Sequence, residues 1–212
     1  MSLAARVASM EAYLEALTEV RAEIVEILMW EIAKNAADAA KEFDRTVAFA
    51  REVIADVRAS DATSQFGEWT SVAGSRGRSR RGPVGVALML APFNYPLNEM
   101  YAMLVPALLM GNTVVLKLPA IGALSHVLSA AALAKTLPKG VVNFVTGSGR
   151  ATLPAIMKTG LVDALGYIGG SKGADAVISA HPQPHRLKVF SQLEGKNQTS
   201  NDTSLERFTF FF

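Results

Sequence analysis

A side-chain amide held between two prolines is the first candidate for chemistry in the sequence. The apolar run Val84–Leu90 leads into Ala-Pro-Phe-Asn-Tyr-Pro-Leu, which places Asn94 between Pro92 and Pro96. Each proline fixes its own φ and lacks a backbone donor, so the loop is stiff and the Asn94 amide is held in one place. A fixed amide donor can stabilise a developing oxyanion. The alternative is that Asn94 only caps the helix that follows.

A lysine ends the next apolar run. Lys117 closes a β-branched segment that begins at Thr113, and Pro119 comes two residues later. An ammonium at the end of a strand is well placed to bind ribose hydroxyls or a phosphate, and a surface lysine without a ligand is the alternative. The residue three positions beyond the lysine is Ala120 rather than an acid, which bears on the ligand that the lysine can bind.

Two glycine turns follow later apolar runs. One reads Thr-Gly-Ser-Gly and contains Gly147 and Gly149, and the other reads Ile-Gly-Gly-Ser and contains Gly170 and Ser171. Glycine lets the backbone approach a phosphate at a helix N-terminus, although a tight turn needs glycine for conformational reasons alone. Two such turns at neighbouring strand ends favour a dinucleotide site more strongly than either turn does separately.

Thiol and metal chemistry find little support. The sequence contains no cysteine, which excludes a disulfide, a thiolate ligand and a cysteine nucleophile within this chain. His181 and His185 are four residues apart, but Pro182 and Pro184 prevent them from sharing a helix face, so we predict no metal site. His126 lies in an apolar helical stretch and is expected to be a core or boundary histidine with its hydrogen bonds satisfied.

The elements that must position these residues alternate along the chain from residue 84 onward. Strands separated by helices predict an α/β fold, a Rossmann-like open parallel sheet with helices on both faces. Right-handed crossovers place every strand-to-helix turn on one edge of such a sheet, and this edge binds ligands in open α/β folds. The predicted strands are Val84–Leu90, Thr113–Leu118, Val141–Thr146, Val162–Ile168 and Leu187–Phe190, with helices near residues 97–110, 122–136, 151–159 and 171–180.

Two segments precede this sheet. Residues 1–62 carry apolar side chains at helical spacing and predict two or three amphipathic helices, with Met29 and Trp30 in the core. Residues 63–82 change to Ser, Gly, Thr and Arg and are typical of a hairpin with an edge strand. The hairpin ends in a basic run at residues 76–81, which no aromatic stacking platform accompanies. We therefore expect a solvated or interface hairpin.

The composition is that of a globular protein. The chain has 212 residues, of which 50% are hydrophobic and 19% charged, with a formal net charge of +2. This balance argues against a disordered tail and against an electrostatically driven nucleic-acid binder. The N-terminus lacks the apolar core of a secretory signal, and no run reaches the roughly 18 apolar residues of a membrane helix. We expect a cytoplasmic protein without nucleic-acid or membrane partners.

Five motifs, in their order and spacing, resemble the N-terminal, coenzyme-binding portion of the aldehyde dehydrogenase superfamily. The similarity is greatest to its branch of non-phosphorylating glyceraldehyde-3-phosphate dehydrogenases. The motifs are PFNYPLN (92–98), PALLMGNTVVLKLPA (106–120), PKGVVNFVTGSG (138–149), GGS (169–171) and LEGKN (193–197).

The resemblance implies a role for each candidate residue. Asn94 would bind the oxyanion of the tetrahedral adduct, Lys117 would bind the adenosine ribose, and Phe93 would pack near the nicotinamide. The path of the adenine and pyrophosphate would be lined by Gly147, Gly149, Gly170 and Ser171. Family members often carry a glutamate where this chain has Ala120. Without that charge nothing repels a 2′-phosphate, so we expect the site to accept NADP in addition to NAD. The hairpin resembles part of the oligomerisation element, which implies a homo- or hetero-oligomer.

The chain departs from the family at two places. Gln192 stands at the position of the general-base glutamate, and the nearest carboxylate, Glu194, is two residues further, about 6 to 7 Å along an extended strand. An amide cannot take up a proton, so Glu194 is the candidate substitute. The family's catalytic cysteine, which forms the thiohemiacetal from which hydride leaves, has no counterpart in this chain.

These observations predict a truncated NAD(P)-dependent aldehyde dehydrogenase that lacks its catalytic domain. The parent reaction would be oxidation of an aldehyde to a carboxylic acid. The expected division is N-terminal helices at 1–62, an oligomerisation hairpin at 63–82, the coenzyme-binding domain at 83–197 and a tail unlike the family at 198–212. The alternatives are a non-catalytic module that pairs with a full-length subunit, and a chain that misfolds for lack of partner surface.

Overall fold

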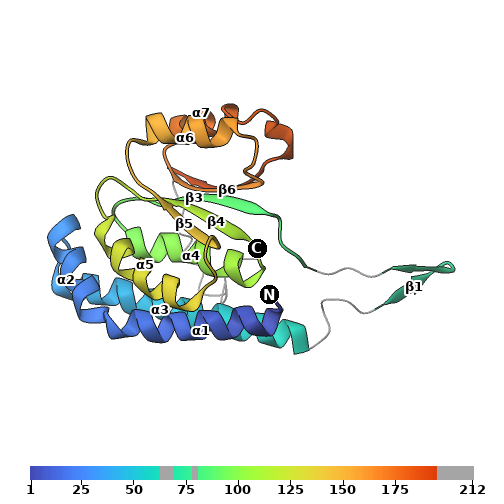
Figure 1. Ribbon diagram of the computed structural model, residues 1–212, viewed down its shortest axis with the longest axis horizontal. Coiled ribbons are helices and arrows are strands. Elements are labelled where there is room, and N and C mark those ends of the chain that lie inside the picture. Colours follow the sequence, from blue (N-terminus) through green and yellow to red (C-terminus); the bar gives the residue numbers. More distant parts are fainter. Residues whose placement is uncertain (63–68, 78–80, 195–212) are drawn as a thin grey trace, which may run out of the picture.

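The computed structural model describes residues 1–62, 69–77 and 81–194, which stack in four layers (Figure 1). One face of a central sheet is covered by α4 and α5, which the N-terminal helices cover in turn, and α6 and α7 cover the other face. The elements are α1 (Leu3–Glu19), α2 (Arg21–Ile32), α3 (Ala36–Ala62), β1 (Thr70–Val72), β2 (Ser75–Gly77), β3 (Val86–Leu90), α4 (Pro96–Leu109), β4 (Thr113–Lys117), α5 (Leu124–Thr136), β5 (Val142–Val145), α6 (Gly149–Lys158), β6 (Ala164–Gly169), α7 (Ser171–Ser179), a 3-10 turn (Pro184–Arg186) and β7 (Lys188–Leu193).

The central sheet confirms the predicted fold class. The described residues form five parallel strands in the order β5-β4-β3-β6-β7. The chain reverses its direction of winding beside β3, which pairs with β4 on one side and with β6 on the other. Leu90 at the end of β3 lies opposite both Lys117 and Tyr167. The ends of the three strands therefore meet at one edge, as right-handed crossovers require.

A tight contact fixes where β3 begins, two residues later than the sequence predicts. Gly85 has φ +135°, and a Cβ at this position would lie 2.0 Å from the Asp163 carboxylate. That carboxylate accepts a hydrogen bond of 2.9 Å from the backbone N–H of Val86. Only glycine combines this φ with such a close approach, and the contact sets the register between β3 and β6.

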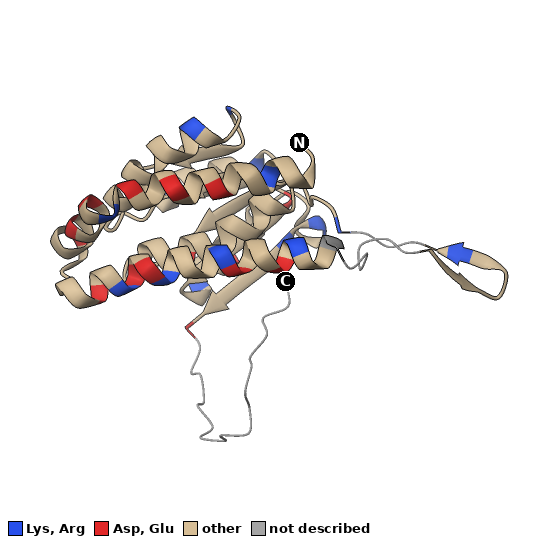
Figure 2. Ribbon diagram, turned by 90° about the horizontal axis from the view of Figure 1, so that it is seen from below, with Lys and Arg blue, Asp and Glu red and all other residues tan. Residues whose placement is uncertain are grey.

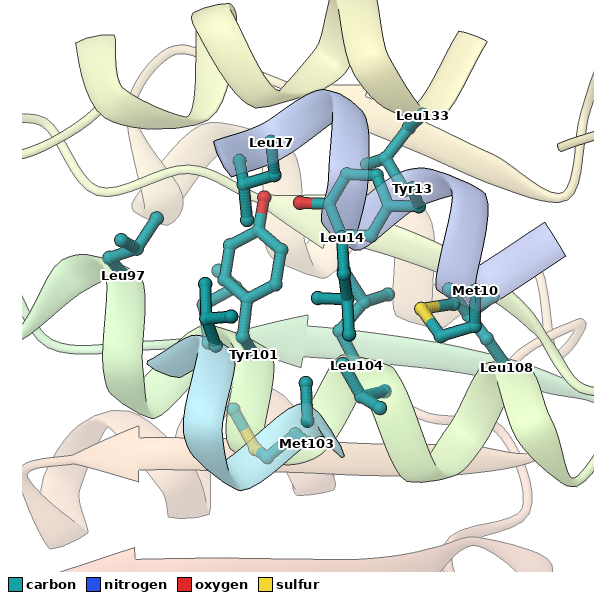
Figure 3. Packing of buried hydrophobic residues seen from close by; sticks show 14 of the residues in the cluster. Met10, Tyr13, Leu14, Leu17, Leu97, Tyr101, Met103, Leu104, Leu108 and Leu133 are labelled. Atoms are coloured by element: carbon teal, nitrogen blue, oxygen red, sulfur yellow. The ribbon is translucent and has the colours of Figure 1, made fainter. Parts of the chain in front are cut away.

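The N-terminal segment forms three helices within the described residues, and α1 packs on α4 through aromatic rings. Tyr13 and Tyr101 stack with ring centroids 6.1 Å apart, and their hydroxyls point toward each other in Figure 3. His126 of α5 also stacks on Tyr101, with ring centroids 6.0 Å apart. The rings therefore join α1, α4 and α5. No helix among the described residues is both long and apolar enough to be a membrane span.

The expectation that Met29 and Trp30 lie in the core is wrong. Trp30 is 82% exposed and Met29 is also exposed. Ile24 and Leu28, one turn apart, already occupy the inner face of α2, so the helical period turns both larger side chains outward. Figure 2 shows acidic and basic residues alternating along the outer helices, as expected of a solvated face.

The hairpin of β1 and β2 extends away from the body of the molecule (Figure 1). Its strands pair antiparallel, with Thr70 opposite Gly77. Trp69 is exposed, and the Arg76 guanidinium lies 5.3 Å from its ring centroid. Part of the predicted hairpin, residues 63–68, and part of the basic run, residues 78–80, belong to segments that the structure does not describe. The same holds for the predicted tail at 198–212.

Candidate functional site

A pocket of about 390 Å³ opens at the carboxyl edge of the sheet, where β3, β6 and β7 end. Of the residues that the sequence predicts for the site, Asn94 and Glu194 come together here. Gln192 also faces this pocket. Its lining consists of Pro92, Asn94, Tyr95, Glu99, Ile168, Gly169, Gln192 and Glu194.

The Asn94 side chain is exposed and does not cap α4. The cap position belongs to Tyr95, which makes no side-chain capping bond. The first N–H groups of the helix, those of Leu97 and Asn98, instead donate to one oxygen of Glu42 at 3.0 and 3.2 Å. Because α4 is capped from another helix, the Asn94 amide stays available to a ligand in the pocket.

Glu42 and Lys34 contact the loop that carries Asn94 and the start of α4. Neither residue was identified from the sequence. The Glu42 side chain of α3 is buried, with the residue 2% exposed, and forms an ion pair with Lys34. The Lys34 ammonium lies 3.7 Å from the centroid of the Tyr95 ring. A glutamate at a buried position beside Phe43 and Thr46 of α3 is the sequence signal that could have revealed the pair.

Lys117 lies at the predicted strand end but is turned inward. The residue is 6% exposed, and its ammonium donates to the backbone carbonyl of Leu118. Burial lowers the pKa of the Lys117 ammonium, because removing a charge from water disfavours the charged form. Ala120 nearby is exposed. An anionic ligand in place of the neutral Leu118 carbonyl would therefore stabilise the charged form of the lysine.

The helix after this strand is capped from a distance, as α4 is. The Glu31 carboxylate of α2 accepts hydrogen bonds of 2.9 Å from the N–H groups of Ala123 and Leu124, at the start of α5. Sequence reasoning missed Glu31 too, because the contact joins residues 92 positions apart.

The two glycine turns lead into helices that lack such caps. Gly147 has φ +95°, which requires glycine, and α6 starts at Gly149 without a side-chain cap. Gly170 precedes α7 and likewise provides none. In the described part of the chain, both helices thus begin with N–H groups that no side chain caps. Unsatisfied N–H groups and the helix dipole together favour an anion there.

Glu194 directly follows β7 and contacts the start of α7. The Ser171 hydroxyl donates to Glu194 at 3.0 Å, and Glu194 has the uncommon φ of +26°. The pKa of the Tyr167 hydroxyl is raised, mainly by burial and to a lesser extent by the negative charge of Glu194. Phe93, by contrast, is 61% exposed and is not among the residues that line the pocket.

The histidines do not form a metal site. Among the described residues, no group of three or more His, Cys, Asp or Glu side chains could hold a metal ion. A ring nitrogen of His181 lies 3.1 Å from the carbonyl oxygen of Val162. His126 is fully buried as predicted, but neither of its ring nitrogens has a well-formed hydrogen bond within the described residues. The expectation of a satisfied histidine is therefore wrong, because the Pro96 carbonyl beside the ring does not form a well-formed hydrogen bond with it.

The parallel sheet, its reversal beside β3 and the glycine turns at its carboxyl edge define a Rossmann-like α/β domain that binds ligand at that edge. Residues 1–203 match the Aldehyde dehydrogenase family. The chain therefore belongs to the aldehyde dehydrogenase family.

Individual relatives agree with this assignment. The chain is 33% identical over 192 residues to NADP-dependent glyceraldehyde-3-phosphate dehydrogenase of Pisum sativum, and 32% identical over 186 residues to alpha-ketoglutarate semialdehyde dehydrogenase of Haloferax volcanii. These matches cover 85% and 86% of this chain but 37% of each relative. The NADP-complexed glyceraldehyde-3-phosphate dehydrogenase of Bacillus halodurans superposes with a TM-score of 0.80 at 30% identity, covering 93% of this chain and 41% of that one.

Proposed function

We propose that this chain is the coenzyme-binding portion of an NADP-dependent aldehyde dehydrogenase. The observation that carries the proposal is the meeting of Asn94, Lys117 and two uncapped helix N-termini at one edge of a parallel sheet. The relatives named NADP-dependent support the choice of coenzyme. We propose the same division as the sequence predicts: helices at 1–62, an oligomerisation hairpin at 63–82, the coenzyme domain at 83–197 and a separate tail at 198–212.

The residues at the edge fit a dinucleotide. The uncapped starts of α6 and α7, with Gly147, Gly149, Gly170 and Ser171, would receive its adenine and pyrophosphate groups. Lys117 would donate to the adenosine ribose and to a 2′-phosphate in place of the Leu118 carbonyl. Phe93 would pack beside the nicotinamide. When bound, the coenzyme supplies the hydride acceptor.

The choice of NADP follows from charge. An acid near the end of β4 would repel a 2′-phosphate, and Ala120 leaves that position neutral. The desolvated ammonium of Lys117 gains more from a doubly charged phosphate than from ribose hydroxyls. We therefore expect NADP to bind at least as tightly as NAD.

In the complete reaction, Asn94 would donate its amide to the oxyanion that forms when a thiolate adds to the aldehyde. The thiolate must come from outside this chain, which has no cysteine. Gln192 cannot serve as a general base, and Glu194, which lines the same pocket, is the candidate substitute. The aldehyde substrate would bind only to an enzyme that contains the thiolate. We propose that this enzyme is cytoplasmic.

Titration of the full chain with NADP by calorimetry tests the proposal. We expect saturable binding, and the variant Lys117→Ala should weaken NADP binding about tenfold or more, because a charge-assisted bond to phosphate is lost. The variant Ala120→Glu should weaken NADP binding more than NAD binding. Tight NAD binding without NADP binding would contradict the choice of coenzyme, and turnover of an aldehyde by the pure chain would contradict the proposal that it acts as a coenzyme-binding portion.

A second function is favoured by the projecting hairpin. Trp69 and Val72 are exposed on it, away from the body of the molecule (Figure 1). The chain could use this hairpin to pair with a second copy or with a full-length subunit. Co-purification with a tagged full-length relative, abolished by Trp69→Glu, would support this role. Phe66, the other aromatic residue of the predicted hairpin, lies outside the described residues.

A further inference from the structure

The start of α7 already carries a carboxylate of the chain itself. The Ser171 hydroxyl donates to one oxygen of Glu194 at 3.0 Å. A Cβ placed on Gly170 would lie 2.8 Å from the other oxygen. The carboxylate therefore lies against the Gly170–Ser171 turn, where the coenzyme pyrophosphate would bind.

This carboxylate differs from those that cap α4 and α5. Glu42 is buried and paired with Lys34, and both it and Glu31 accept hydrogen bonds from backbone N–H groups. Glu194 is exposed, directly follows the edge strand β7 and accepts a hydrogen bond from a hydroxyl in α7. Its φ of +26° is unfavourable for a residue with a side chain. Displacing the Glu194 side chain from α7 therefore breaks one exposed hydrogen bond and requires little free energy.

We propose that Glu194 is an anion gate, a carboxylate that occupies the start of α7 and competes with a phosphate of the coenzyme there. The inference rests on the proposed function. Two negative charges a few ångströms apart repel each other even in water, so the dinucleotide must displace Glu194 before its pyrophosphate reaches Ser171. Glu194 sets the affinity of the site for the pyrophosphate and leaves the adenosine end unaffected. This role differs from that of a general base, which requires the carboxylate to face the reacting carbon.

The experiment compares the full-length chain with Glu194→Gln by calorimetric titration with NADP. Glutamine retains an acceptor for Ser171 and removes only the charge. We expect NADP to bind about five- to tenfold more tightly to the variant, and the difference to shrink in 1 M salt because screening weakens the repulsion. Glu194→Gly removes both the carboxylate and the unfavourable φ, and should bind at least as tightly as Glu194→Gln.

Two controls separate the gate from a general charge effect. Adenosine 2′-monophosphate has no pyrophosphate, so its affinity should be equal in the chain and in Glu194→Gln. Asp175→Asn removes one negative charge from an exposed position on the same helix, and should leave the NADP affinity unchanged. A gain in Glu194→Gln that neither control shows would support the gate.

The outcomes distinguish this inference from the proposed function. If NADP binds the unaltered chain as tightly as Glu194→Gln, or if Asp175→Asn gives the same gain, the gate is wrong and the coenzyme site stands. If neither the chain nor either Glu194 variant binds NADP or adenosine 2′-monophosphate, the proposed function is wrong, and the gate with it. Circular dichroism melts of each variant show that the protein being titrated is folded.

Discussion

The helices on the two faces of the central sheet differ in how their N-termini are capped. On the face of α4 and α5, which we term the closed face, Glu42 and Glu31 accept hydrogen bonds from the first backbone N–H groups of the helices. On the face of α6 and α7, the open face, no side chain of the described residues caps either helix. Because N–H groups at a helix start attract anions, the closed face satisfies them within the chain and the open face leaves them for a ligand.

The N-terminal helices explain the difference. They cover the closed face only (Figure 1), so they can deliver carboxylates to α4 and α5 but not to α6 and α7. Asn94 and Lys117 lie at the ends of the strands that lead into the closed face. Glu42 caps α4 directly after the Asn94 loop, whereas the exposed Glu194 lies on the open face, against the start of α7. Changes to the caps of the closed face should therefore affect stability, and changes on the open face should affect ligand affinity.

The largest expected effect is the loss of Glu42. Glu42→Ala leaves the Lys34 ammonium and two backbone N–H groups without their partner. Removing one member of a buried ion pair costs about 3–5 kcal/mol, which urea denaturation measures. The control is Asp44→Ala, which breaks the exposed pair with Arg21 and should cost less than about 1 kcal/mol. A loss below that value in Glu42→Ala would show that the closed face does not depend on this cap.

Acid should destabilise the closed face through His126. Burial lowers the pKa of its ring to about 4, and the nearby Pro96 carbonyl opposes only part of that shift. The unfolded chain, with a histidine pKa near 6.5, binds the proton more readily, so stability falls as the pH drops from about 6.5 to 4, by roughly 3 kcal/mol. His126→Phe keeps an aromatic ring and removes the titration. Urea midpoints of the two proteins should diverge in this range, and parallel curves would exclude His126 as the cause.

A smaller effect is expected at the second cap. Glu31→Ala removes the acceptor for the N–H groups of Ala123 and Leu124. The loss of one helix cap costs about 1 kcal/mol, up to about 2. Glu26→Ala changes an exposed glutamate of the same helix, so it should leave the melting temperature nearly unchanged. Equal melting temperatures in the two variants would argue that the α5 cap adds nothing.

The smallest effect on stability is expected on the open face. Ser171→Ala removes an exposed hydroxyl whose partner is Glu194, and should change the free energy of unfolding by no more than about 0.5 kcal/mol. NADP affinity should fall roughly tenfold in the same variant, because a hydrogen bond to a charged phosphate is lost. Loss of stability without loss of affinity would reverse the assignment of the two faces.

The sequence was sufficient for features encoded by neighbouring residues. Alternating apolar runs and helical stretches predicted the parallel sheet, because strand and helix periods are local. The stiff loop around Asn94 and the strand end at Lys117 were predicted for the same reason. The roles of these residues toward a coenzyme remain predictions.

The caps could not be predicted, because they join segments far apart in the chain. Glu42 meets Leu97 across 55 residues, and Glu31 meets Ala123 across 92. An apolar or acidic position in a helix does not reveal its distant partner. Trp30 was misplaced for a related reason. Its size favours burial, but the inner face of α2 was already filled by Ile24 and Leu28.

The packing of α1 has a consequence for how the chain is made. Arg6 donates to the carbonyl of Leu109 at 2.7 Å, a contact across 103 residues, and Tyr13 stacks on Tyr101. At the usual rate of translation, roughly 5 to 20 s pass between the synthesis of α1 and that of α4. The apolar stripe of the nascent helix, which includes Leu14, is without these partners throughout that interval. Until α4 has been made, the first helix can bury part of this stripe only against the other N-terminal helices, α2 and α3.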